Sequence, residues 1–126
     1  MARKIAYWIT TSIVVLMMTF AGVTYLMGSP QAVEGFAHMG YPQHVRIALG
    51  AAKVLGAVIL IVPGLPLVKE WAYAGFAFAW VLAAIGHYLA GDGISSITPL
   101  VLLAIMIVSY LTRPPSRRLA LSAVPA

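Results

Sequence analysis

Five side chains of this 126-residue sequence have the types and positions to carry chemistry in apolar surroundings. Lys53, His87 and Asp92 lie in or beside long apolar runs, and Glu34 and His38 lie in the longest connection between such runs. An ionisable group within an apolar run is costly to place in lipid and often marks a functional site. The residue types are compatible with polar contacts to a ligand, with an internal ion pair or with a metal site.

Four apolar runs must position these groups, and they predict helices that cross a membrane. The composition is 62% hydrophobic and 9% charged, whereas soluble domains have about 25% charged residues. The runs cover residues 5–27, 46–62, 71–90 and 94–112. Helices are expected because every backbone polar group must be satisfied within lipid. We therefore predict an all-α integral membrane four-helix bundle, a single membrane domain over residues 1–126 with a mobile tail at 113–126.

The basic residues predict the orientation of this bundle. With four spans, most of them fall on the side that holds both termini: Arg3, Lys4, Lys69, Arg113, Arg117 and Arg118. The opposite side carries Arg46. By the positive-inside rule both termini face the cytoplasm. Membrane topology thus accounts for the net charge of +5, and nucleic acid is not an expected partner. The Lys69-Glu70 pair is expected to be solvated or to cap the third span.

The first outer loop carries the signals of a short interfacial helix. Ser29-Pro30 is typical of an N-cap followed by proline in the first turn, and Gly40-Tyr41-Pro42 is typical of a stop. Glu34 and His38 are four residues apart, so they would be neighbours on the polar side of this helix.

Small residues at four-residue spacing predict that the second and third spans pack tightly as an antiparallel hairpin. The two stripes are Ala48, Ala52, Gly56 and Gly75, Ala79, Ala83. Small side chains let helix backbones approach closely in lipid, where apolar burial gives no drive for association. The alternative is that these stripes form the interface of a homo-oligomer.

Lys53 is the most informative single residue. It lies roughly 10 Å below the outer end of the second span, where a lipid-facing lysine costs at least about 2.5 kcal/mol. We therefore expect it to face the bundle interior and to meet His87 and Asp92 there. Glu34 and His38 would cap the same region. Three interpretations stay open: a structural ion pair of Lys53 with Asp92 or Glu34, a pocket for a small molecule, and a metal site built from Glu34, His38, His87 and Asp92.

Conventional enzyme motifs are missing from the sequence. There is no cysteine, so the chain alone has no thiol, disulfide or iron–sulfur chemistry. There is also no nucleotide-binding glycine loop, no serine nucleophile elbow and no haem attachment motif. We expect no catalytic activity from the chain on its own, and no metal.

The sequence resembles the DoxX-like family of small four-helix bacterial membrane proteins. The likeness covers nearly the whole chain up to Arg113 and is carried by these segments: Gly40-Tyr41-Pro42, Lys53-Val54-Leu55-Gly56, Pro63–Pro66, Lys69–Phe76, His87 and Gly91-Asp92. The resemblance implies a multi-pass protein of the bacterial inner membrane. Some related proteins are subunits of thiosulfate:quinone oxidoreductase, and others are linked to membrane complexes of oxidative stress. The recurring Lys, His and Asp positions of the family correspond to Lys53, His87 and Asp92.

These observations lead to one functional hypothesis and two alternatives. The hypothesis is an accessory subunit, or a binder of a quinone- or lipid-like molecule, in a membrane redox or stress-related complex. Its ligand contacts would come from Lys53, His87, Asp92, Glu34 and His38, with Trp80, Phe76 and Met17 as apolar walls. Quinone is the one cofactor suggested, and the partners would be lipid, other membrane subunits or a second copy. The alternatives are a structural subunit without a ligand and a proton-linked carrier of small solutes.

Overall fold

The computed structural model describes residues 1–119, and within them the regular structure is entirely helical. The helices in chain order are α1 (Ala2–Met27), α2 (Pro30–His38), α3 (Gln43–Ile61), α4 (Pro66–Leu89), the 3₁₀ turn η1 (Gly93–Ser96), α5 (Ile97–Leu111) and the 3₁₀ turn η2 (Pro115–Arg117). Four segments are long and apolar enough to cross a membrane: α1, α3, α4 and η1 with α5. The predicted all-α membrane architecture is confirmed.

The predicted spans are right in number and differ at their ends. Helix α4 begins at Pro66 rather than at residue 71, because proline fits the first helical turn, where the missing N–H needs no partner. Helix α3 begins at Gln43 rather than at residue 46. The fourth span opens with the 3₁₀ turn η1 before α5 continues it.

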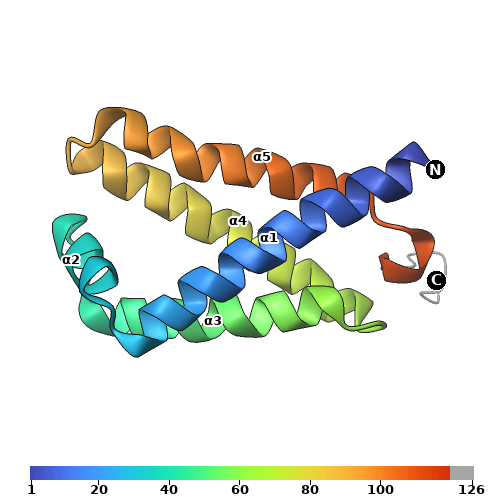
Figure 1. The fold of residues 1–126 in the computed structure, drawn as a ribbon, viewed down its shortest axis with the longest axis horizontal. Helices are drawn as coiled ribbons and strands as arrows, with labels where there is room; N and C mark the ends of the chain where they lie inside the picture. Colours follow the sequence, from blue (N-terminus) through green and yellow to red (C-terminus); the bar gives the residue numbers. More distant parts are fainter. Residues whose placement is uncertain (120–126) are drawn as a thin grey trace, which may run out of the picture.

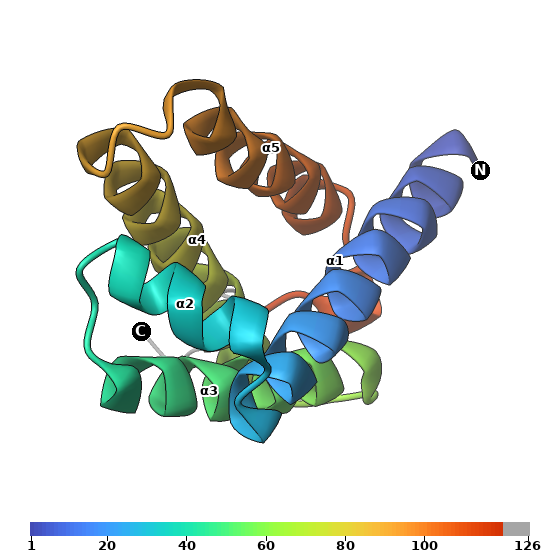
Figure 2. The ribbon, with the colours of Figure 1, turned by 60° about the vertical axis from the view of Figure 1, so that its left-hand side comes forward.

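The short helix predicted in the first loop is confirmed as α2. Its N-cap is Ser29, whose hydroxyl oxygen accepts a hydrogen bond from the Ala32 N–H at 3.2 Å. The Phe36 ring is buried and meets the Tyr25 ring edge to face, with 5.0 Å between the ring centroids. Helix α2 lies across one end of the bundle, over α3 and α4 (Figure 2). The N-terminus and η2 lie at the opposite end (Figure 1).

Helix α3 makes its closest approach to α1, which crosses it diagonally (Figure 1). A Cβ added at Gly22 would come within 2.6 Å of Val54 Cγ2 and 2.8 Å of the Gly50 carbonyl oxygen. A Cβ added at Gly50 would come within 2.9 Å of Tyr25 Cβ. Glycine at both positions is therefore what allows the two backbones to touch.

The prediction that α3 and α4 pack tightly through their small residues is wrong. Ala52 and Gly75 are exposed, and no atom outside the local chain lies within 4 Å of a Cβ built at Gly75. Of the two small-residue stripes, Gly56 makes a close contact, with the Phe76 ring. The two helices are thus bridged by a large side chain, and all of the stripe residues except Ala48 line cavities between the helices.

The end of the bundle opposite α2 is held by charged side chains. Lys69 is 1% exposed, and its ammonium donates to the carbonyl oxygens of Ile59 and Val62 at the end of α3. Glu70 accepts from the Tyr110 hydroxyl at 2.7 Å and pairs with Arg113. The expectation that Lys69 and Glu70 stay in solvent or cap their own helix is therefore wrong, because other helix ends supply their partners.

Residues 113–119, the first part of the expected mobile tail, pack against the bundle. Arg113 is buried against Glu70, and Arg117 Nη1 donates to the Leu60 carbonyl oxygen at 2.8 Å. Arg117 also lies over the Trp8 ring, 5.0 Å from its centroid. These contacts hold the chain against the ends of α1, α3 and α4. Residues 120–126 of the expected tail lie outside the described part of the chain.

Candidate functional site

Lys53 lies near the middle of α3 and faces the bundle interior, as expected. It lies about 15 Å along the helix axis from Gln43, deeper than the sequence suggested, because α3 starts earlier. Its side chain is 6% exposed. The ammonium nitrogen lies 3.5 Å from Met18 Sδ and 5.5 Å from the centroid of the Tyr25 ring. A thioether is a weak acceptor, so the surroundings from α1 satisfy this group poorly.

The predicted ion pair of Lys53 is not formed. Within residues 1–119, no carboxylate oxygen lies within 4.0 Å of its ammonium nitrogen. Asp92 bonds to two histidines instead. Glu34 is exposed on α2 and takes part in no side-chain hydrogen bond among the described residues. The site expected from the sequence is therefore divided into two separate groups of residues.

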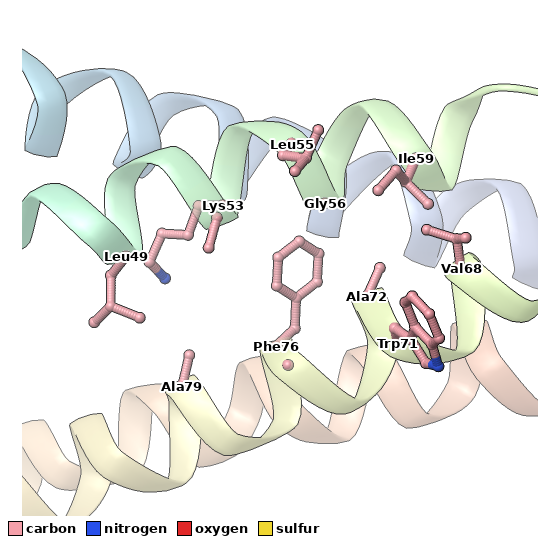
Figure 3. A pocket seen from close by; sticks show the side chains of 12 residues that line it. Leu49, Lys53, Leu55, Gly56, Ile59, Val68, Trp71, Ala72, Phe76 and Ala79 are labelled. Carbon is pink, nitrogen blue, oxygen red and sulfur yellow. The ribbon is translucent and has the colours of Figure 1, made fainter. Parts of the chain in front are cut away.

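Two apolar cavities meet at Lys53. The larger, of about 520 Å³, lies between α3 and α4 and is called here the α3–α4 chamber. The smaller, of about 240 Å³, lies under α2 and is called the α2 chamber. Leu49, Lys53 and Ala79 line both. Figure 3 shows the nitrogen of Lys53 in the space between the two helices, beyond the Phe76 ring that reaches toward Gly56.

The walls of both chambers are almost entirely apolar. In the α3–α4 chamber they extend from Lys53 past Phe76 toward Ile59, Val68 and Trp71. The α2 chamber is closed by Phe36 and Met39 from the α2 end and by Leu82 from α4. The Tyr41 hydroxyl, which borders it, already donates to the Leu82 carbonyl oxygen at 2.7 Å. Lys53 is therefore the charged group that both chambers offer to a ligand.

Of the three apolar residues expected to form the walls of the pocket, one lies in the core, one on the surface and one in a chamber wall. Trp80 is 3% exposed and packs in the core, with its ring centroid 6.0 Å from that of Phe76, and it lines neither chamber. Met17 is 43% exposed, and the neighbouring Met18 is the methionine that contacts Lys53. Phe76 lines the α3–α4 chamber as expected.

The second group joins α2 to the connection between α4 and α5. Asp92 Oδ1 lies 2.6 Å from His38 Nε2, and Asp92 Oδ2 lies 2.6 Å from His87 Nδ1. We call these three residues the His–Asp–His latch. Hydrogen bonds from His87 and then from His38 hold the pKa of Asp92 below its ordinary value of 3.8. The expected meeting of His38, His87 and Asp92 is thus found, without Lys53 and Glu34.

The side chains of the latch bond to one another. Both carboxylate oxygens of Asp92 face imidazole nitrogens, so they are engaged by hydrogen bonds within the latch. Across residues 1–119, no group of three or more His, Cys, Asp or Glu side chains is arranged to hold a metal ion. The interpretation of Glu34, His38, His87 and Asp92 as one metal centre is therefore not supported.

Sequence reasoning missed the contribution of α1 to the site. Met18 and Tyr25 lie next to the ammonium of Lys53, and both follow a stripe at three- and four-residue spacing on that helix. This stripe also contains Thr11, whose hydroxyl lies 2.6 Å from that of Ser109 on α5. Thr11 and Gly22, which lie three helical turns apart within an uncharged span, were the available signal that this face of α1 turns inward.

The comparison with known families gives a match over most of the chain. The sequence profile of the DoxX-like family matches residues 9–109. This range covers most of α1 and α5 and all of α2, α3, α4, Lys53 and the latch. No curated protein and no solved structure is significantly similar to the chain.

Proposed function

Since the chain belongs to the DoxX-like family and is a small integral membrane protein, we propose that it binds a quinone- or lipid-like molecule from the bilayer. The observation that carries this proposal is a buried lysine at the junction of two apolar chambers. The protein would act as a non-catalytic, accessory component, because Lys53 is the one charged side chain that lines its chambers and its sequence has no cysteine.

The chambers have the character of a small-molecule site. Such sites are concave, mostly apolar and of roughly 300–1,000 Å³, with few polar groups that fix the ligand's orientation. The α3–α4 chamber alone has about 520 Å³. A lysine ammonium has three N–H donors, and Met18 Sδ accepts one of them weakly. A carbonyl or anionic oxygen of a ligand would satisfy the remaining donors.

Entry from the lipid is supported by the exposure of the chamber's rim. Ala52, Leu55, Trp71 and Gly75 line the α3–α4 chamber and are also exposed on the side of the bundle. In a membrane, that side faces acyl chains. A molecule dissolved in the bilayer would therefore reach Lys53 without passing through water.

Native mass spectrometry of the gently purified protein tests this function. We expect the wild-type chain to retain a small amphipathic molecule and Lys53→Met to lose it. Lys4→Met is the matched control, because Lys4 is exposed at the end of the bundle away from α2.

A second variant pair tests the chamber itself. Gly75→Leu places a side chain where a Cβ has open space and removes a helix glycine, which favours the helix by up to about 1 kcal/mol. It should fill the chamber and displace the ligand, whereas Ala74→Leu, one position away and outside the chamber lining, should not. Equal retention by all four variants would refute the proposed function.

A further inference from the structure

The ammonium of Lys53 differs from every other buried cation in the described structure by lacking an oxygen acceptor. Four cationic side chains are buried: Arg46, Lys53, Lys69 and Arg113. Arg46 bonds to Gln43 Oε1 and to the Tyr25 carbonyl oxygen. Lys69 bonds to two carbonyl oxygens at the end of α3, and Arg113 pairs with Glu70. Lys53 has a sulfur atom and an aromatic ring.

This difference favours an anionic ligand over a neutral one. A charge in apolar surroundings is costly unless it is paired and hydrogen-bonded. A neutral carbonyl would supply hydrogen bonds but leave the net charge in place. An anionic oxygen would accept the hydrogen bonds and also neutralise the positive charge. The ligand and Lys53 together would then form a neutral, hydrogen-bonded pair.

The shape of the space favours a single chain attached to that anion. Lys53 lies where the chambers meet, so a headgroup bound to it leaves the α3–α4 chamber for the rest of the molecule. If a methylene takes about the volume of a water molecule in the liquid, roughly 30 Å³, then 520 Å³ holds a chain of roughly fifteen to twenty carbons. The two chains of a phospholipid would not both fit inside this volume.

The depth of Lys53 favours an anion that can travel uncharged. The residue lies about 15 Å along α3 from Gln43, far below the level of lipid headgroups. A carboxylic acid can cross apolar surroundings in its protonated, neutral form, and one proton is released to the aqueous phase when the acid pairs with the ammonium of Lys53. A phosphodiester, by contrast, stays charged at neutral pH. A charge carried to that depth would cost several kcal/mol.

We propose that the ligand is a long-chain carboxylic acid, with its carboxylate on the ammonium of Lys53 and its chain in the α3–α4 chamber. This assignment rests on the proposed function and narrows it to one class of ligand. Trp71 and Val68 at the far end of the chamber would then limit the length of the chain.

Competition binding in detergent micelles tests the headgroup. The probe is hexadecanoic acid, and the competitors are its methyl ester, a two-chain anionic phospholipid and a ubiquinone analogue with a short isoprenoid tail. Since hydrogen bonds to charged groups contribute about 1.5–3 kcal/mol, we expect the acid to bind at least about tenfold more tightly than the ester. Lys53→Met should remove this difference, and its unfolding temperature should be measured to show that it is folded.

The preferred chain length of the bound acid gives a second test, which leaves Lys53 unchanged. Gly75→Leu shortens the chamber, so it should weaken binding of hexadecanoic acid more than binding of decanoic acid. Ala74→Leu should leave the preferred length unchanged.

The outcomes separate the two proposals. Equal binding of the acid and the ester, or an undiminished preference for the acid in Lys53→Met, would overturn the carboxylic acid assignment. Tighter binding of the quinone or the phospholipid than of the acid would also overturn it, while the proposed function would stand. If no compound bound and the purified protein retained no small molecule, both proposals would fail.

Discussion

Lys53 and Lys69 are both buried lysines, and the atoms around their amines give them opposite roles. Lys69 bonds to the free carbonyl oxygens at the end of α3 and so stabilises the junction of α3 with α4. A helix end leaves such carbonyl groups without intrahelical partners. Lys53 lies next to Met18 Sδ, in the middle of a span, where no helix end supplies an oxygen. The same residue type is thus structural at one position and available to a ligand at the other.

This contrast predicts opposite effects of the same substitution on stability. Lys53→Met should raise the free energy of unfolding of the ligand-free protein by about 1–3 kcal/mol, because it removes a buried donor group without an oxygen partner. Lys69→Met should lower it by about 1–3 kcal/mol, because two carbonyl oxygens lose their donor. Denaturation in detergent followed by tryptophan fluorescence measures both. A loss of stability in Lys53→Met would show that its amine has an effective partner in the ligand-free bundle.

At the scale of helices, the crossing of α1 and α3 sets the width of the chamber. Gly22 and Gly50 let these two helices touch, whereas Phe76 keeps α3 and α4 apart at Gly56. Helix α3 is thus drawn toward α1 on one side and held off α4 on the other. The stripe residues other than Ala48 line the resulting space rather than close it.

Adding one methyl group at the crossing should be costly. Gly22→Ala would place a Cβ 2.8 Å from the Gly50 carbonyl oxygen, so the backbones must move apart. Such overpacking costs about 1–3 kcal/mol, which thermal unfolding of the purified protein would detect. Gly75→Ala is the control, because its Cβ meets open space and alanine favours a helix. Equal stability of Gly22→Ala and the wild type would contradict the close crossing.

The His–Asp–His latch should hold helix α2 over the α2 chamber. Asp92→Ala removes both hydrogen bonds, so the distance between α2 and the α4–α5 connection should become more variable. Spin labels on cysteines introduced at the exposed positions Ala37 and Ile94 would report this distance, and the chain has no native cysteine to interfere. Glu34→Ala is the control, since Glu34 has no side-chain hydrogen bond within residues 1–119.

The same labels test the effect of pH on the latch. Because the pKa of Asp92 is lowered in the folded chain, its stabilising contribution is fully present above the ordinary value of 3.8. The contribution is lost as the pH falls through the lowered pKa. The wild-type distance distribution should therefore stay narrow from neutral pH to about pH 4 and broaden only in stronger acid. Broadening that begins above pH 5 would contradict this assignment of the carboxylate.

At the scale of the whole molecule, the basic side chains are concentrated at one end of the bundle. Arg3, Lys69, Arg113 and Arg117 gather at the end opposite α2, where they bond to helix ends and to Glu70. Arg3 Nη2, for example, donates to the Leu111 carbonyl oxygen at 2.7 Å. These residues therefore serve packing in addition to the positive-inside signal.

The orientation N-in/C-in in a bacterial inner membrane stays a prediction that thiol labelling can test. Cysteines introduced at Ala2 and Ser95 lie at opposite ends of the bundle, and both positions are exposed. In intact bacterial cells, a reagent that cannot cross the inner membrane should label the variant Ser95→Cys. It should label Ala2→Cys only after the membrane is opened. The reverse pattern would contradict the predicted orientation.

The sequence by itself determined the four spans, the α2 helix and the inward position of Lys53. These features follow from local terms: the cost of charge in lipid, the cap at Ser29 and the proline at position 66. The neighbours of Lys53 were decided by the tertiary structure. The ion pair with Asp92 was a reasonable expectation from depth alone, but the histidines compete for that carboxylate. Which groups meet depends on how helices cross, and here a glycine contact between α1 and α3 and one phenylalanine between α3 and α4 decide it.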